Sequence, residues 1–205
     1  MATAAKKTST DSSAASRELP TLQFGDAAGW LSWLERNHDR APGLWIKLAK
    51  KASGDRSVSY DEALDGALRW GWIDGQKRSF DERAWLQKFT PRSARSVWSK
   101  INRDKALALI ARGEMQSPGL AEVERAQRDG RWDAAYDSPR NAQIPADLAA
   151  ALAAAPRAAE FFAKLNAANR YAILWRVQQA KREDTRKKRI DMFIAMLARR
   201  EKLHS

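Results

Sequence analysis

The chain has 205 residues, of which 44% are hydrophobic and 30% charged, a balance typical of a folded globular protein rather than a disordered, fibrous or membrane one. Lys and Arg number 37 against 25 Asp and Glu, so the formal net charge is +12 at pH 7 and a negatively charged partner is expected. Cysteine is absent and the two histidines are His38 and His204. This excludes disulfides, thiol catalysis and cysteine-based metal sites, and leaves too few histidines for a multi-histidine metal centre.

The N-terminal segment, Met1 to Pro20, consists mainly of Ala, Ser, Thr and Lys and has no apolar run that resembles a signal-peptide core. No later stretch approaches the roughly 18 apolar residues of a transmembrane helix. We therefore expect residues 1–23 to form a disordered tail, and we expect a cytoplasmic protein without a transmembrane segment.

The next part of the chain predicts two helices with a strand between them. Apolar residues spaced at i, i+3, i+4 and i+7 indicate a helix over 26–37. Apolar residues alternate with others over 44–49, as in a half-buried strand. Ser59 and Glu62 form a capping box that begins a second helix over 59–71.

A hairpin follows, with strands at 76–80 and 84–90 joined by a turn at Asp81–Glu82. A small antiparallel sheet of these strands and 44–49, covered on one face by the two helices, would bury the tryptophan-rich surfaces. The first part of the chain, 24–136, is therefore predicted to be an α+β domain.

The second half predicts helices almost throughout, bounded by Pro, Gly and Ser at their ends. The predicted helices span 94–112, 118–128, 146–154, 157–165, 168–181 and 184–200. The loop over 131–144 contains Asp, Ser, Pro and Asn and is the expected boundary. Residues 137–205 are therefore predicted to form a helical C-terminal module.

Several short motifs occur in a fixed order along the chain. They are Trp33–His38, Lys50–Gly54, Tyr60–Asp65, Gly71–Gly75, Phe89–Arg92, Trp98–Asn102, Gly130–Trp132, Pro145–Leu148, Ala180–Lys181, Thr185–Arg186 and Lys188–Ile190. In this order they resemble the YdeI/OmpD-associated family, also called bacteriocin-protection proteins, over about residues 24–200. The resemblance implies a bacterial α+β protein with a helical C-terminal module. It also implies a role in envelope stress or antimicrobial-peptide tolerance, and it brings no catalytic residue set.

The richest candidate site lies where the second hairpin strand ends and the next helix starts. Phe89–Arg92 is followed by Ser and basic residues, so that free backbone N–H groups and cations could converge on an anion. From Asp74 to Lys105 there are nine basic and four acidic residues. The predicted ligand-binding residues are Asp74, Lys77, Arg92, Trp98, Ser99 and Lys100. The alternative is an ordinary capped helix with a solvated basic surface.

Asp74 stands between Ile73 and Gly75, where a carboxylate needs a partner or a role. A structural ion pair with Lys77, Arg92 or Lys100 would explain it. An unrecognised enzyme that uses Asp74 as a base near Arg92 is a further alternative. The glycines on either side of this connection predict a positive φ or a close approach of another backbone.

Nucleic-acid binding is a third hypothesis, because aromatic and basic residues interleave between Trp72 and Trp98. The cations assigned to it are Lys50, Lys51, Arg186, Lys188 and Arg189. The last three crowd the first turns of the final predicted helix, where positive charge opposes the helix dipole. Most of the nine tryptophans are nonetheless expected in the core.

No nucleophile elbow, phosphate-binding loop or dinucleotide motif occurs. The leading expectation is thus a non-enzymatic binding protein without cofactor or metal, whose partner is an anionic small molecule or an acidic protein. Its oligomeric state is not specified by the sequence.

Overall fold

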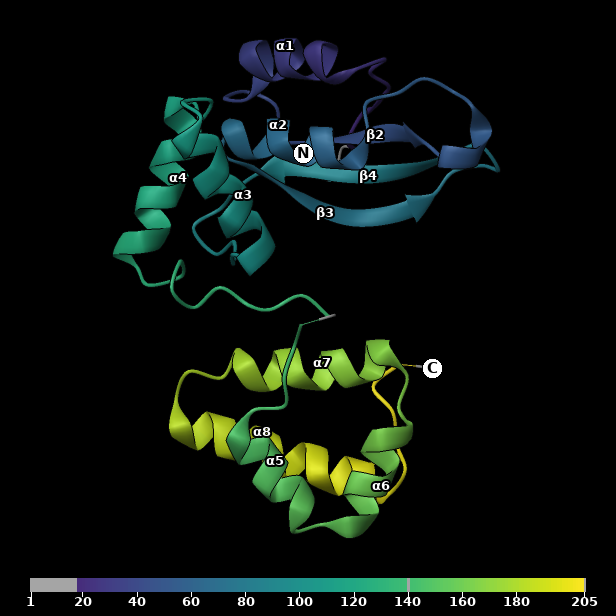
Figure 1. The fold of residues 1–205 in the computed structure, drawn as a ribbon, viewed down its shortest axis with the longest axis vertical. Coiled ribbons are helices and arrows are strands. Elements are labelled where there is room, and N and C mark those ends of the chain that lie inside the picture. Colours follow the sequence, from purple (N-terminus) through teal and green to yellow (C-terminus); the bar gives the residue numbers. More distant parts are fainter. Residues whose placement is uncertain (1–17, 140, 205) are drawn as a thin grey trace, which may run out of the picture. The chain divides into compact units, whose positions relative to one another are not determined.

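The computed structural model describes residues 18–139 and 141–204, and the chain forms two compact units. Unit 1 contains the chain up to Ala67 together with Trp72–Pro91, and unit 2 contains Leu68–Gly71 together with the chain from Arg92 onward. The predicted α+β class with a helical C-terminal module is confirmed (Figure 1). Residues 1–17 of the expected tail lie outside the described residues.

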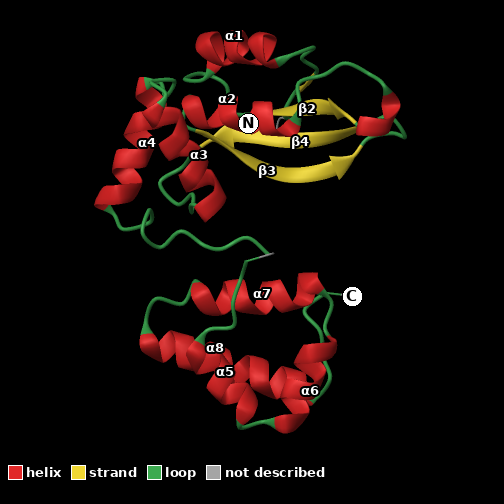
Figure 2. Cartoon of the chain, viewed as in Figure 1, coloured by secondary structure: helices red, strands yellow, loops and turns green. Residues whose placement is uncertain are grey.

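Unit 1 is built on a four-stranded sheet with strand order β1-β2-β4-β3, of which Figure 2 shows β2, β4 and β3 side by side. The strands are β1 (Thr21–Leu22), β2 (Leu44–Ala49), β3 (Trp72–Ser79) and β4 (Ala84–Pro91). The three expected strands pair antiparallel, whereas β1 pairs parallel to β2. Strand β1 was not predicted, and its position shows that the fold begins before residue 24.

Strand β3 begins at Trp72, whereas the sequence predicted a start at residue 76. Its pairing register with β4 shifts between Asp74 and Lys77. Such a bulge interrupts the two-residue alternation on which the prediction depended. The buried side chain of Gln87 supports the bulge, since its Nε2 donates a hydrogen bond to the Gly75 carbonyl oxygen at 2.9 Å.

Two helices, α1 (Ala27–Asn37) and α2 (Tyr60–Arg69), lie on one face of the sheet (Figure 1). Trp30 of α1 is fully buried, and its Nε1 donates to the Ala63 carbonyl oxygen of α2 at 2.9 Å. Its ring centroid lies 6.2 Å from that of Trp72 and 5.8 Å from that of Phe89, on adjacent strands. Trp30 therefore ties both helices to the sheet.

The predicted start of the second helix and end of the first are confirmed, whereas α2 ends at Arg69 rather than at the predicted residue 71. The Ser59 backbone N–H donates to a Glu62 carboxylate oxygen at 2.8 Å, as a capping box requires, and this bond holds the pKa of Glu62 below its ordinary value. His38 is the C-cap of α1, where its backbone N–H donates to the Leu34 carbonyl oxygen. A short 3₁₀ helix, Lys51–Ser53, follows β2.

Unit 2 is helical. Its elements are α3 (Lys100–Ala111), α4 (Ser117–Arg128), α5 (Ala146–Ala153), α6 (Pro156–Lys164), α7 (Ala167–Gln178) and α8 (Glu183–Ala198). The prediction that the first of these begins at residue 94 is wrong. Ser99 has extended backbone angles and caps α3, while the Ser93 backbone N–H bonds the Ser96 hydroxyl in a separate turn.

Helices α5 to α8 share a hydrophobic core, to which α8 contributes the apolar stripe of Ile190, Phe193 and Leu197. All three side chains are buried, so this stripe packs against the neighbouring helices. None of the helices in the described residues is long and apolar enough to cross a membrane.

Candidate ligand-binding site

The six predicted site residues divide between the two units. Asp74 and Lys77 lie on β3 in unit 1. The Asp74 carboxylate accepts a hydrogen bond from the Tyr60 hydroxyl at 2.9 Å, and the Lys77 ammonium lies 4.2 Å from the Trp85 ring centroid. Both polar groups therefore have contacts within unit 1.

Arg92 and Trp98 form a buried pair in unit 2. Arg92 is 6% exposed, and its guanidinium carbon lies 3.5 Å from the Trp98 ring centroid. Trp98 in turn contacts Trp132, with ring centroids 4.9 Å apart. The pair contributes to the interior of unit 2, where cation–π attraction is strongest.

A cluster of charged residues surrounds Glu122 of α4. Arg125 pairs with its carboxylate, and Arg92 and Arg131 lie close enough to favour the charged form. Burial nevertheless raises the pKa of Glu122, because the loss of hydration outweighs the three cations.

Ser99 and Lys100 form the start of α3, and the backbone groups expected to meet an anion have internal partners. The Ser99 hydroxyl accepts from the Asn102 N–H at 3.1 Å, and the Lys100 N–H donates to the Tyr136 carbonyl oxygen at 2.9 Å. The Lys100 side chain extends to Asp137, with 2.8 Å between ammonium and carboxylate. Ser99 therefore has the capping role, and Lys100 reaches a different place.

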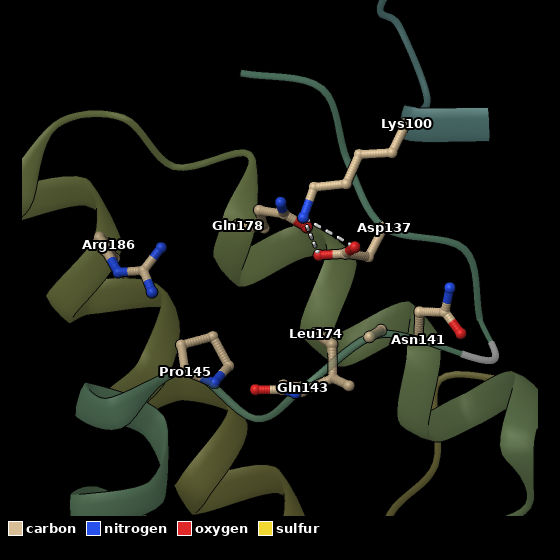
Figure 3. A pocket seen from close by; sticks show the side chains of 9 residues that line it. Lys100, Asp137, Asn141, Gln143, Pro145, Leu174, Gln178 and Arg186 are labelled. Carbon is tan, nitrogen blue, oxygen red and sulfur yellow. Dashed lines mark hydrogen bonds and ion pairs between the residues drawn. The ribbon is translucent and has the colours of Figure 1, made fainter. Parts of the chain in front are cut away.

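That place is a pocket of about 470 Å³ in unit 2 (Figure 3). Its lining combines two cations, one carboxylate and three carboxamides with a few apolar groups. The lining residues are Lys100, Asp137, Asn141, Ala142, Gln143, Pro145, Leu174, Gln178 and Arg186. Sequence reasoning had assigned Lys100 and Arg186 to separate hypotheses and had missed the carboxamides.

Arg186 is held in the pocket wall by α5 and α7. Its Nη2 donates to the Asp147 carboxylate at 2.9 Å, and its Nη1 donates to the Val177 carbonyl oxygen at 2.8 Å. Arg189 donates to the Arg176 carbonyl oxygen. Both arginines thus meet the carbonyl end of α7, which favours cations, and this explains the positions of Arg186 and Arg189 in the first turns of α8.

The other cations assigned to nucleic acid lie elsewhere. Lys188 and Lys51 are exposed, and the Lys50 ammonium donates to the Asp81 carbonyl oxygen at 2.8 Å. Among the interleaved rings, Trp85 is covered by the Lys77 ammonium at 4.2 Å from its centroid, and Trp72, Phe89 and Trp98 are buried. Because these rings are buried or covered by a cation, the structure favours a packing role for them over stacking on nucleic-acid bases.

Replacing Asp147 with Asn is expected to lower the free energy of unfolding at pH 7 by about 1 kcal/mol, because the ion pair is partly exposed. Hydrogen bonds from Arg186 hold the pKa of Asp147 below its ordinary value. The wild-type advantage should therefore be present above the ordinary carboxyl range and vanish as the pH falls through the lowered pKa. Urea unfolding at pH 7 and pH 3 measures it, and an equal difference at both values would contradict the pairing.

Comparison with protein families gives the two parts of the chain different relatives. Residues 141–200 match the model of the Bacteriocin-protection, YdeI or OmpD-Associated family. This match confirms the resemblance for the C-terminal module, hereafter the YdeI/OmpD-associated domain. Residues 22–122 match the model of a domain of unknown function, DUF8412, so the resemblance is not confirmed there. Searches of the curated proteins and of the solved structures gave no match.

The YdeI/OmpD-associated domain supplies seven of the nine pocket residues, and all except Lys100 and Asp137 lie within it. It contains 12 Lys and Arg against 5 Asp and Glu, so more than half of the net charge of +12 falls in these 60 residues. Among the described residues, no group of three histidine or carboxylate side chains could hold a metal ion.

Proposed function

We propose that this chain is a binding protein that holds a small hydrophilic anion in the pocket of Figure 3. The observation that supports it is the position of Lys100 and Arg186 on the walls of one polar pocket. The volume of about 470 Å³ is within the usual range for small-molecule sites. The roles of Asp74, Lys77, Arg92, Trp98 and Ser99 in anion binding stay predictions.

The lining favours a ligand that carries both a negative charge and hydroxyl groups. Asp137 fixes the Lys100 ammonium with both carboxylate oxygens, and an ammonium has three N–H donors, so the ion pair leaves donor capacity for a ligand. The carboxamides of Asn141, Gln143 and Gln178 can each donate and accept hydrogen bonds. A hydroxylated carboxylate, such as a sugar acid, matches this combination.

We further propose that ligand binding serves tolerance of envelope stress or bacteriocins, and the bacteriocin-protection description of the matched family supports the second of these roles. Direct capture of cationic peptides does not fit a chain of charge +12, because like charges repel. An indirect role through a small anionic ligand avoids this conflict.

Lys100→Gln is expected to weaken binding of D-glucuronate at least about tenfold, because a charge-assisted hydrogen bond is lost. Isothermal titration calorimetry measures the affinity, with D-glucose as the uncharged probe and inorganic phosphate as the charged probe without a sugar ring. The matched control is Lys188→Gln, which removes the same charge from an exposed position of α8 outside the pocket.

Equal weakening by both variants would contradict a local site and indicate diffuse attraction. Native mass spectrometry at low and high salt tests the nucleic-acid alternative on the same samples. Heterogeneous bound masses that salt removes, and that Lys188→Gln reduces, would favour nucleic acid, because each neutralised phosphate releases counterions.

A further inference from the structure

Unit 2 contains a second pocket, of about 550 Å³, that shares no lining residue with the first. It is formed mainly by one side of α7 and is apolar except at its rim. The lining residues are Pro139, Ala167, Ala168, Tyr171, Ala172, Trp175, Arg176 and His204. Here we call it the α7 pocket.

The α7 pocket owes its space to small residues beside two aromatic rings. Ala168 and Ala172 are one helical turn apart, and Tyr171 and Trp175 follow the same spacing, so methyl groups and rings alternate along one side of the helix. The Tyr171 hydroxyl donates to the Asp137 carbonyl oxygen at 2.9 Å, which fixes its ring. Burial raises the pKa of Tyr171 to about 12, so this hydroxyl remains a donor at neutral pH.

The rim is built by a buried asparagine that holds the end of the chain. Asn169 is 1% exposed, and its Oδ1 accepts from the backbone N–H groups of Leu203 at 3.0 Å and His204 at 2.9 Å. Its Nδ2 donates to the His204 carbonyl oxygen at 3.1 Å. The side-chain amide is thus used on both sides to fix His204 beside the α7 pocket.

The basic group at the rim is Arg176. Its Nη1 donates to the Ala172 carbonyl oxygen at 3.2 Å, which lays the guanidinium along α7. A guanidinium has five N–H donors in a planar fork that suits a carboxylate. The α7 pocket therefore combines an apolar floor, two aromatic rings and a basic rim.

We propose that the α7 pocket binds an aromatic carboxylate, with the ring among Trp175, Tyr171 and the alanines and the carboxylate at Arg176. Charge complementarity argues for an anion over a neutral apolar ligand. A second copy of the chain fits less well, because a two-fold contact centred here would bring two identical basic rims together. The site is separate from the one under the proposed function, so each can fail alone.

The test compares indole-3-acetate with its neutral isostere indole-3-acetamide by isothermal titration calorimetry. We expect the acetate to bind at least about tenfold more tightly, since an arginine–carboxylate bond adds to ring burial. Arg176→Gln should remove this preference and leave the affinity for the amide unchanged. The matched control Arg157→Gln removes an exposed arginine of α6 that lines neither pocket and should keep the preference.

Ala172→Leu fills the floor and should abolish binding of both probes while the circular dichroism spectrum stays unchanged. Lys100→Gln should leave both affinities as they are. Equal affinities for acetate and amide, absence of binding, or a preference that survives Arg176→Gln would overturn the proposal. A dimer detected by light scattering and dissolved by Ala172→Leu would also overturn it, in favour of a second copy.

Discussion

Trp30→Ala is expected to lower the free energy of unfolding of unit 1 by about 4 kcal/mol, within the range for deleting a buried aromatic side chain. The side chain is fully buried and its ring meets those of Phe24, Trp33, Trp72 and Phe89 at centroid distances of 5.2 to 6.2 Å. The Ala63 carbonyl oxygen also loses its indole donor. Guanidinium chloride unfolding followed by circular dichroism measures the loss.

Gly66 provides a control from the opposite side of the contact. A Cβ at Gly66 would lie 2.8 Å from the Trp30 ring, so Gly66→Ala should cost about 1 to 3 kcal/mol in the wild type. In the Trp30→Ala background the same methyl group would enter the cavity and cost little. Additive losses in the double variant would contradict this packing.

The second large effect is expected at Gly119 of α4, in unit 2. A Cβ there would lie 2.4 Å from the Arg69 carbonyl oxygen and 2.8 Å from that of Leu68, and backbone atoms cannot move aside alone. Gly119→Ala should therefore lower the free energy of unfolding by about 3 kcal/mol, at the upper end for overpacking. The midpoint of chemical unfolding measures it.

Gly113→Ala is a control that distinguishes the steric clash expected at Gly119 from the backbone strain of a glycine with positive φ. Gly113 has φ of 67° and open space around a Cβ, so alanine there should cost about 1 kcal/mol through its left-handed conformation. If both alanine variants lost the same stability, the close approach at Gly119 would not be the cause.

The same approach explains Gly71. Its φ is 72°, and a Cβ would lie 2.9 Å from the Pro118 carbonyl oxygen. The sequence predicted one of these two reasons for each glycine of this connection. Both apply at Gly71, and neither applies at Gly75, where a Cβ would meet only the Lys88 side chain at 3.7 Å.

Elements with a continuous apolar stripe or a capping motif could be predicted from the sequence, as α1, α2 and α8 demonstrate. The predictions of secondary structure failed where the local sequence pattern does not reflect the structure. The bulge in β3 interrupts the alternation, and β1 is too short to show a period. Helix α3 starts late because Ser99, rather than the earlier serines, provides its cap.

The charged residues of the candidate pocket could be singled out from the sequence, but their convergence on one pocket could not. Lys100 and Arg186 each stood out as cations at helix starts, yet no periodic pattern joins residues 86 positions apart. The carboxamides that share their pocket come from a loop and from the end of α7. The presence of Arg186 and Arg189 near the start of α8 could be explained only once the α7 carbonyl groups were known to lie beside them.

The hydrogen bonds of Asn169 to Leu203 and His204 have a practical consequence for work with the purified protein. An affinity tag joined at the C-terminal end would emerge beside the α7 pocket, where its first residues could fill the space or pull His204 from the rim. A histidine tag there would also add imidazoles next to Arg176. Recombinant protein for ligand screening should therefore not carry its tag at this end.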